Sequence, residues 1–406
     1  KLSKTVQEIL LINMVLMSFV YIVYFLGIVF VPELKVEKTL FLISGLNILF
    51  TIVGVEWLYK GIEQYFYITI RSIIFKLIAF LLVFTCVKTE NDYSAYAFII
   101  IFATVGSGVV NLYNLRKIIT IKYFSNYDFK RHLKPMMTFF ITTIAVAFYV
   151  NVSVALLGFI QGNEEVGYYN AAYRIKDVMV SIVTSLGAVL LPRLSYYIEN
   201  NMWDKFNNIL SKSTQFIFIL SLPLVVFCIL FAKPSVLILA GSAYSGSIIP
   251  LQVLALIIFI VGLSNLTGIQ MLIPLKKEKY LCYSVVIAAV INMVLNLILI
   301  PEYGAIGAAV SVMVAESSIL IYQIYILRAY SQVLFGGISY MRIIMALTLA
   351  ISVSIWLNIN LSYNEIIVFL VSASLFFICY LGVLLLSKEP FIFTILNQIR
   401  SKLTKN

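Results

Sequence analysis

Long runs of apolar residues, separated by short polar segments, follow one another along this whole sequence. A helix needs about 20 apolar residues to cross the hydrocarbon layer of a bilayer, and twelve runs are of about this length. None has the short alternating pattern of an outer-membrane barrel strand. The sequence therefore predicts an all-helical, polytopic membrane protein. The twelve expected spans are 9–31, 40–59, 69–87, 94–115, 136–160, 168–192, 213–231, 247–273, 280–300, 304–327, 341–357 and 364–387.

Composition and charge agree with a chain whose solvent is lipid. The chain is 62% hydrophobic and 12% charged, against about 45–50% and about 25% in soluble domains. If the connections alternate across the membrane, 22 of the 29 lysines and arginines fall on the side of the N-terminus and four on the other. By the positive-inside rule, both termini are expected in the cytoplasm. The net charge of +11 is thus mainly a topology signal, and nucleic acid is not an expected partner because the basic residues are dispersed.

The sequence lacks motifs typical of metal binding, nucleotide binding and catalysis. The four cysteines lie apart in apolar runs without C-x-x-C spacing, and there is a single histidine, so no metal site is expected. No phosphate-binding G-x-x-x-x-G-K-[ST] loop occurs. A membrane polysaccharide polymerase or ligase would need catalytic groups and usually a large outer loop, whereas the expected outer loops are short and lack an acid/base constellation. We therefore expect no catalytic residues, metal or organic cofactor.

A weak internal repeat suggests that spans precede residue 1. Residues 40–84 align with 251–300, which places Glu63 opposite Glu278 and Tyr65 opposite Tyr280. The alignment pairs expected spans 1–4 with 7–10, so spans 5 and 6 have no counterparts. We therefore expect a chain truncated by two spans at its N-terminus. The alternative is a complete twelve-span protein.

The sixth expected span carries charges well inside its apolar run. A stripe of polar residues recurs there at intervals of three and four: Asn170, Arg174, Asp177, Ser181 and Thr184. Such a stripe faces a cavity or another helix, because lipid does not solvate it. Arg174 and Asp177 are one turn apart and can pair, whereas Lys176 points about 200° away from Arg174. The alternatives are a pair that only joins helices, or side chains that snorkel outward.

Other polar residues inside the expected spans are further candidates. Lys76 lies deeper than Arg71, which is expected near the cytoplasmic interface. Glu316 falls close to the bilayer midplane, where a carboxyl group is either protonated or paired. Three asparagines, at positions 265, 292 and 296, either line a cavity or join helices by hydrogen bonds.

Five stretches of this sequence carry a resemblance to a known family. They are GVEWLYKGIEQY (54–65), EEVGYYNAAYRIKDVMVSIVTSLGAVLLPRLS (164–195), LAGSAYSGSIIPLQVLAL (239–256), NLTGIQMLIPLKKEKY (265–280) and INMVLNLILIPEYGAIGAAVSVMVAES (291–317). In order and spacing, the chain resembles the polysaccharide-transport (Wzx-type) flippases of the multidrug/oligosaccharidyl-lipid/polysaccharide exporter superfamily. The resemblance implies fourteen spans, with two six-span lobes in a V and two further C-terminal helices. It divides this chain into an N-lobe (1–125), a C-lobe (126–330) and a C-terminal pair with its tail (331–406).

The resemblance also implies a function. It predicts that undecaprenyl-pyrophosphate-linked oligosaccharide, a unit of O-antigen, capsule or another exopolysaccharide, crosses the bacterial cytoplasmic membrane by alternating access. The implied partners are this lipid-linked substrate, membrane lipid, a polysaccharide polymerase and a chain-length regulator. A lipid II flippase and a multidrug antiporter for organic cations remain alternatives.

Residue roles follow from combining this cargo with the polar positions. The expected ligands of the substrate are Arg174, Lys176, Lys76, Arg71 and Asn170. Glu316 and Asp177 are expected to couple transport to H⁺ or Na⁺. The expected polar lining of the cavity is Ser181, Thr184, Asn265, Asn292 and Asn296.

Overall fold

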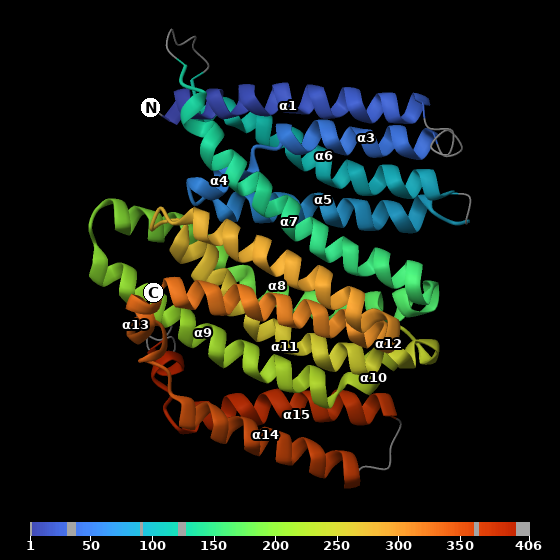
Figure 1. Ribbon diagram of the computed structural model, residues 1–406, viewed down its shortest axis with the longest axis vertical. Coiled ribbons are helices and arrows are strands. Elements are labelled where there is room, and N and C mark those ends of the chain that lie inside the picture. Colours follow the sequence, from blue (N-terminus) through green and yellow to red (C-terminus); the bar gives the residue numbers. More distant parts are fainter. Residues whose placement is uncertain (1, 31–37, 90–91, 121–126, 361–364, 395–406) are drawn as a thin grey trace. The chain divides into compact units, whose positions relative to one another are not determined.

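The computed structural model describes residues 2–30, 38–89, 92–120, 127–360 and 365–394. Within these ranges every regular element is helical and no strand is present (Figure 1). This confirms the all-α class expected from the apolar runs. The chain forms two compact units, Lys1–Met137 and Thr138–Asn406. The three-part lobe division expected from the sequence stays a prediction.

The first unit is a small helical bundle. Its helices are α1 (Leu2–Phe30), α3 (Lys38–Val53), α4 (Glu56–Gly61), α5 (Tyr65–Cys86), α6 (Tyr93–Ile118) and the first turns of α7 (Lys130–Gln161). α3 packs against α1 and α6, and α6 also packs against α5. A Cβ atom at Gly108 would lie 3.3 Å from the Cα atom of Gly54, so the absence of side chains at both positions allows α3 and α6 to approach closely.

A buried carboxylate fastens the start of α7 to α1. Glu8 is fully buried, and it accepts hydrogen bonds from Arg131 Nη2 at 2.5 Å and from the backbone N–H of Asp128 at 2.8 Å. Nε2 of His132 lies 2.9 Å from the same carboxylate. A buried charge is tolerated only when it is paired and hydrogen-bonded, so this cluster fixes where the connection meets α1.

The turn that leads into α6 is held by an aspartate. Asp92 Oδ2 accepts the backbone N–H groups of Lys88 at 3.0 Å and Thr89 at 2.9 Å. These hydrogen bonds hold the pKa of this exposed carboxyl group below its usual value.

The second unit holds the remaining helices. They are the rest of α7, α8 (Asn163–Glu199), α9 (Trp203–Leu230), α10 (Ala232–Leu239), η2 (Ser242–Ser247), α11 (Ile248–Asn265), η3 (Leu266–Leu272), α12 (Glu278–Ile326), η4 (Arg328–Tyr330), α13 (Ser331–Phe335), α14 (Tyr340–Asn360) and α15 (Glu365–Leu386). α11 packs against α8, α9 and α12, and α14 packs against α15. A helix surrounded in this way is apolar on all sides, as the sequence of α11, IIPLQVLALIIFIVGLSN, shows.

α12 is a hairpin of two antiparallel arms. The backbone turns at Gly304, whose φ of 51° and ψ of −128° are not helical. The arms pack along their length, because Gln323 Nε2 donates to Ser284 Oγ at 3.3 Å and the side chains of Val285 and Ala315 share a buried cluster. The two arms correspond to the expected spans 280–300 and 304–327.

A π-helical segment, η3, continues α11. Gln270 Nε2 donates to Asn265 Oδ1, five residues earlier, at 2.8 Å. Thr267 Oγ1 donates to Gln323 Oε1 in the second arm of α12 at 2.6 Å. Such wide turns inside α-helices occur frequently at functional sites.

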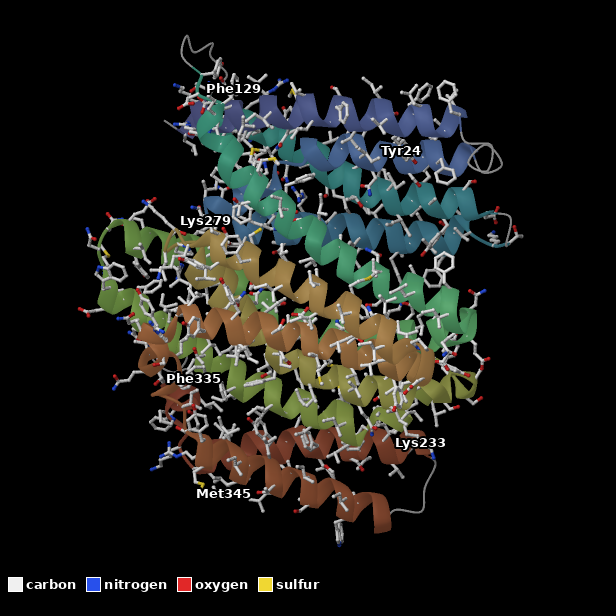
Figure 2. All side chains as sticks on the ribbon, viewed as in Figure 1. Tyr24, Phe129, Lys233, Lys279, Phe335 and Met345 are labelled. Carbon is white, nitrogen blue, oxygen red and sulfur yellow. The ribbon has the colours of Figure 1, made fainter. Side chains whose placement is uncertain are left out.

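The helices are those of a multi-pass membrane protein. In the described part of the chain, nine helices are long and apolar enough to cross a membrane. This number counts α12 once, and it omits α3, which has 16 residues. Figure 2 shows Lys233 and Lys279 at opposite ends of the helices of the second unit, as the alternation of the expected spans requires. The twelve-span count, the missing N-terminal pair and the cytoplasmic termini stay predictions.

Candidate functional site

The charges of α8 separate onto different sides of the helix. Lys176 is 5% exposed, while Arg174 and Asp177 are exposed. Nζ of Lys176 lies 3.7 Å from Oδ1 of Asp177 and 3.7 Å from the ring centroid of Tyr173. A cation over an aromatic face is attracted by the ring quadrupole, by about 2 kcal/mol or more when desolvated. The ring therefore helps to stabilise the charge of a lysine inside a membrane-spanning helix.

The expected pairing of Arg174 with Asp177 is wrong. The ion pair of Asp177 is with Lys176, its neighbour in sequence, and Arg174 makes no ion pair with any described residue. Helical angles place Cβ atoms only, whereas a flexible lysine stem carries its ammonium group several ångströms around the helix.

The side chain of Lys176 lines a cavity to which α7, α8, α11 and α12 all contribute residues. This cavity, here the Lys176 cavity, has a volume of about 610 Å³, within the roughly 300–1,000 Å³ range of ligand pockets. It brings together four residues singled out from the sequence. They are Lys176, Asp177, Asn265 and Glu316. Most other lining side chains are aliphatic, including Val180, Ile257 and Val312.

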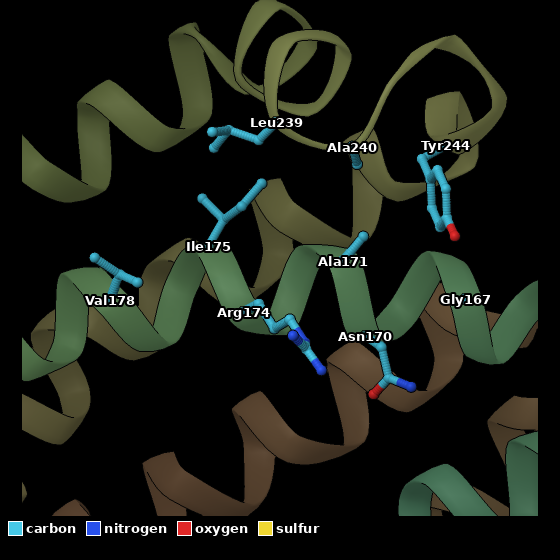
Figure 3. A pocket seen from close by; sticks show the side chains of 9 residues that line it. All are labelled: Gly167, Asn170, Ala171, Arg174, Ile175, Val178, Leu239, Ala240 and Tyr244. Carbon is cyan, nitrogen blue, oxygen red and sulfur yellow. The ribbon is translucent and has the colours of Figure 1, made fainter. Parts of the chain in front are cut away.

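Arg174 opens into a second cavity on α8. This cavity, here the Arg174 pocket, measures about 590 Å³. Figure 3 shows Asn170 and Arg174 projecting from one side of α8, and Tyr244 of η2 with its ring directed at the helix near Gly167. Ala171, Ile175, Val178, Leu239 and Ala240 supply apolar lining. The two cations thus serve different cavities.

Two expected lining residues are instead structural. Asn292 and Asn296 are fully buried in the first arm of α12. Asn296 Nδ2 donates to Ser153 Oγ of α7 at 2.8 Å and to Asn292 Oδ1 at 2.9 Å, and Ser153 Oγ donates to Asn292 Oδ1 at 3.1 Å. The expectation that they line a cavity is therefore wrong, and the alternative of hydrogen bonds between helices holds. The pairing is partial, because Asn292 Nδ2 and Asn296 Oδ1 have no hydrogen-bond partner among the described residues.

The hydroxyl side chains of the polar stripe are satisfied within α8. Ser181 Oγ donates to the carbonyl of Val178 at 2.6 Å, and Thr184 Oγ1 donates to that of Val180 at 2.9 Å. Neither residue lines the Lys176 cavity or the Arg174 pocket. Their role as cavity lining stays a prediction.

The remaining expected ligands lie on α5 in the first unit. Lys76 is exposed, while Arg71 is 8% exposed and its Cζ lies 5.8 Å from the ring centroid of Tyr67. In the described structure the Nε and Nη1 atoms of Arg71 have no hydrogen-bond partner.

Some lining residues were not among those predicted from the sequence. Tyr173 and Gln323 line the Lys176 cavity, and Tyr244 lines the Arg174 pocket. Gln323 lies seven residues beyond Glu316, on the same face of a helix, so a search for polar pairs at that spacing would have found it. Tyr244 lies in a short irregular segment, where periodicity says nothing.

Charged side chains inside a membrane-spanning bundle mark substrate or ion pathways, so the fold and the cavities define a polytopic transporter. Residues 3–198 match the family described as polysaccharide biosynthesis protein, and residues 139–298 match the MatE family. These matches confirm the resemblance to the polysaccharide-transport flippases of the exporter superfamily.

Individual relatives agree with this class. A protein of Shigella dysenteriae named as an O-antigen transporter is 26% identical over 80% of this chain and 81% of its own length. One of Escherichia coli with the same name is 27% identical over 64% of this chain and 63% of its own length, which is less than two thirds of that relative. A Haloferax volcanii protein named as the low-salt glycan biosynthesis flippase Agl15 is 24% identical over 42% of this chain and 36% of its own length. These names denote transporters and flippases, which supports a transporter and not an enzyme.

A solved structure shares the fold. The lipid II flippase MurJ, in an inward closed conformation, superposes with a TM-score of 0.64 at 17% identity. The match covers 94% of this chain and 82% of that protein. At this level of identity the likeness establishes the fold alone.

Proposed function

We propose that this protein is a flippase for lipid-linked oligosaccharide. The observation that carries the proposal is the placing of two cations, Arg174 and Lys176, on different sides of one membrane helix, each lining a cavity large enough for a ligand. The names of the O-antigen transporters and of the glycan flippase that resemble this chain support the same cargo. The proposed substrate is an undecaprenyl-pyrophosphate-linked unit of a surface polysaccharide. The proposed cellular location of the protein is the bacterial inner membrane.

The charges of α8 suit a diphosphate. A diphosphate group must cross roughly 30 Å of hydrocarbon, and charge-assisted hydrogen bonds to cations offset its loss of hydration. Arg174, with Asn170 one turn away, offers donors to the phosphate oxygens in one cavity, and Lys176 offers a cation in the other. Lys76 and Arg71, in the N-lobe (1–125), are further proposed ligands. The C-lobe (126–330) and the C-terminal pair with its tail (331–406) make up the rest of this chain. Rocking of the lobes provides alternating access.

The Lys176 cavity provides the coupling step. Asp177 neutralises Lys176 while no anion is present, and Glu316 lines the same cavity. When the diphosphate pairs with Lys176, the carboxylate that it releases takes up H⁺ or Na⁺. A polysaccharide polymerase and a chain-length regulator act on the product, and both ends of the chain lie in the cytoplasm.

One observation favours a second candidate, an antiporter for organic cations. The Lys176 cavity holds two carboxyl side chains, those of Asp177 and Glu316, against one ammonium group. A mainly apolar cavity with an excess of carboxylates suits a lipophilic cation.

Transport by purified protein in liposomes tests both candidates. The probes are a fluorescent glycosyl diphosphate on a short isoprenyl chain and the lipophilic cation tetraphenylphosphonium. Under the flippase proposal, only the glycosyl diphosphate crosses, and Arg174→Ala or Lys176→Ala slows it by at least about tenfold, which corresponds to about 1.4 kcal/mol. Lys233→Ala, which removes an exposed cation of the same unit, is the matched control and leaves the rate unchanged. Transport of the phosphonium alone would overturn the flippase and establish the antiporter.

A further inference from the structure

The Arg174 pocket has an aromatic wall that a diphosphate does not need. Tyr244 lies in η2, in a backbone conformation that departs from the helix. Gly241, with a φ of 92°, turns the chain into this segment. A Cβ atom at Gly167 would lie 3.5 Å from Cε1 of Tyr244, so the tyrosine ring lies directly against α8 where that helix has no side chain.

A second tyrosine holds this ring in place. The rings of Tyr168 and Tyr244 meet edge to face, with centroids 6.4 Å apart at 83°. Tyr168 is itself fixed, because its hydroxyl group donates to the carboxylate of Glu164 and its ring covers Gly246. The edge-to-face arrangement is a preferred geometry of aromatic pairs. Tyr244 therefore presents a positioned aromatic surface to the pocket.

Three unpaired polar groups converge on the same space. The guanidinium of Arg174, the amide of Asn170 and the hydroxyl of Tyr244 all belong to the pocket lining (Figure 3). None of the three makes a hydrogen bond with any residue that the structure describes. Together they offer one cation, one group that both donates and accepts, and one aromatic ring with a polar tip. This set is complementary to a ligand that is part anion and part polyol.

The chemistry of the lining excludes simpler ligands. A bare diphosphate would leave the ring of Tyr244 with no ligand group to pack on it. A lipid chain would leave the amide and the guanidinium unsatisfied, which costs free energy in an apolar environment. A sugar ring has C–H groups on its faces, which pack on an aromatic ring, and hydroxyl groups at its edge, which pair with an amide. Glycosyl diphosphate satisfies all three groups.

We propose that Tyr244 is the sugar platform of the Arg174 pocket and holds the sugar bonded to the diphosphate. Arg174 and Asn170 are one turn apart along α8, about 6 Å, and Gly167 beneath Tyr244 lies roughly 4–5 Å further on. The pocket therefore orders its ligand along the helix, with the diphosphate at Arg174 and the sugar at Tyr244. This proposal rests on the proposed function and adds the recognition of the first sugar by Tyr244.

Binding of two matched probes to the detergent-solubilised full chain tests the platform. The probes are farnesyl diphosphate and the same lipid carrying one N-acetylglucosamine on its diphosphate. The unchanged protein is expected to bind the glycosylated probe more tightly. Tyr244→Leu should lower that affinity about tenfold, to the level of farnesyl diphosphate, and leave the affinity for farnesyl diphosphate within about twofold. Tyr244→Phe, which keeps the ring, should retain most of the preference.

Controls separate the platform from folding and from the proposed function. Tyr303→Leu replaces an exposed tyrosine of the same unit that does not line the pocket, and it should bind both probes normally. Arg174→Ala should weaken both probes together. Equal affinity of the unchanged protein for the two probes, or an equal loss of both in Tyr244→Leu, would overturn the sugar platform and leave the flippase standing. Failure of the unchanged protein to bind either probe would overturn both.

Discussion

The turn of the α12 hairpin offers a sharp test of the structure through Gly304→Ala. Gly304 has φ of 51° and ψ of −128°, a backbone region that residues with a Cβ atom adopt only under strain. A Cβ atom there would lie 2.4 Å from Oε2 of Glu165, closer than carbon and oxygen can pack. The same carboxylate oxygen accepts the backbone N–H of Ala305 at 2.6 Å. The substitution therefore strains the turn and displaces the group that caps the second arm.

The size of the effect follows from these two contributions. Backbone strain of this kind costs about 1–3 kcal/mol. Loss of a hydrogen bond to a charged group costs about 1.5–3 kcal/mol more. We expect Gly304→Ala to destabilise the protein by about 2.5–6 kcal/mol, and to lower the unfolding temperature of this 406-residue chain by roughly 3–7 °C.

Thermal unfolding in detergent, followed by intrinsic fluorescence, measures this effect. Gly382→Ala is the matched control, because a Cβ atom at that position of α15 meets nothing within 4 Å. It should leave the midpoint unchanged or raise it slightly, since alanine favours the helix by about 1 kcal/mol over glycine. In a Glu165→Ala background the clash is gone, so Gly304→Ala should cost only the backbone strain. An unchanged midpoint for Gly304→Ala would refute the reasoning.

Three further changes test other contacts. Glu8→Gln removes the buried carboxylate that holds Arg131, so trypsin should cleave at Arg131 about tenfold faster, as followed by mass spectrometry; an unchanged rate would count against the cluster. The pKa of Asp92 is lower in the folded protein than in the unfolded chain, so its carboxylate stabilises the turn at any pH above the unfolded-state pKa. This stabilisation is lost as the pH falls through the lower pKa of the folded state. Amide exchange at Thr89, corrected for its intrinsic rate, should therefore accelerate in acid, and Asp92→Asn should abolish that pH dependence. Asn296→Ala removes the hydrogen bonds to Ser153 and Asn292, which then keep only each other. It should cost about 1–3 kcal/mol, seen as a lower unfolding temperature without loss of folded protein.

The apolar runs predict most of the helices, and local spacing predicts some of their packing. The residues around Gly304 separate two runs, and the structure turns there. Gly307, Ser311 and Ala315 recur at intervals of four residues in the second arm of α12, and all three are buried. Both results depend on residues near one another in sequence, where the period of the helix determines which side chains share a face.

The site was harder to predict, for a physical reason. A polar stripe has the same spacing whether it lines a cavity or binds another helix, so Asn292 and Asn296 were assigned to the wrong surface. Their partner Ser153 is 143 residues from Asn296, and nothing local indicates that they meet. Asp177 pairs with Lys176 and not with Arg174 for another reason. Helical angles give the direction of each Cβ atom, but not how far a long side chain reaches around the helix.

The π-helical segment η3 has a consequence for how this span is compared between proteins. A π turn contains one residue more than an α turn spanning a similar distance, and each residue turns the helix by about 100°. Side chains on the two sides of Leu266–Leu272 are therefore out of phase by one residue. An alignment with a protein that has a plain α-helix here matches both faces only if it places a one-residue gap within the segment. In this span, the smallest evolutionary change that alters the angle between Gln270 and Asn265 around the helix axis is thus the deletion of one residue and not a substitution.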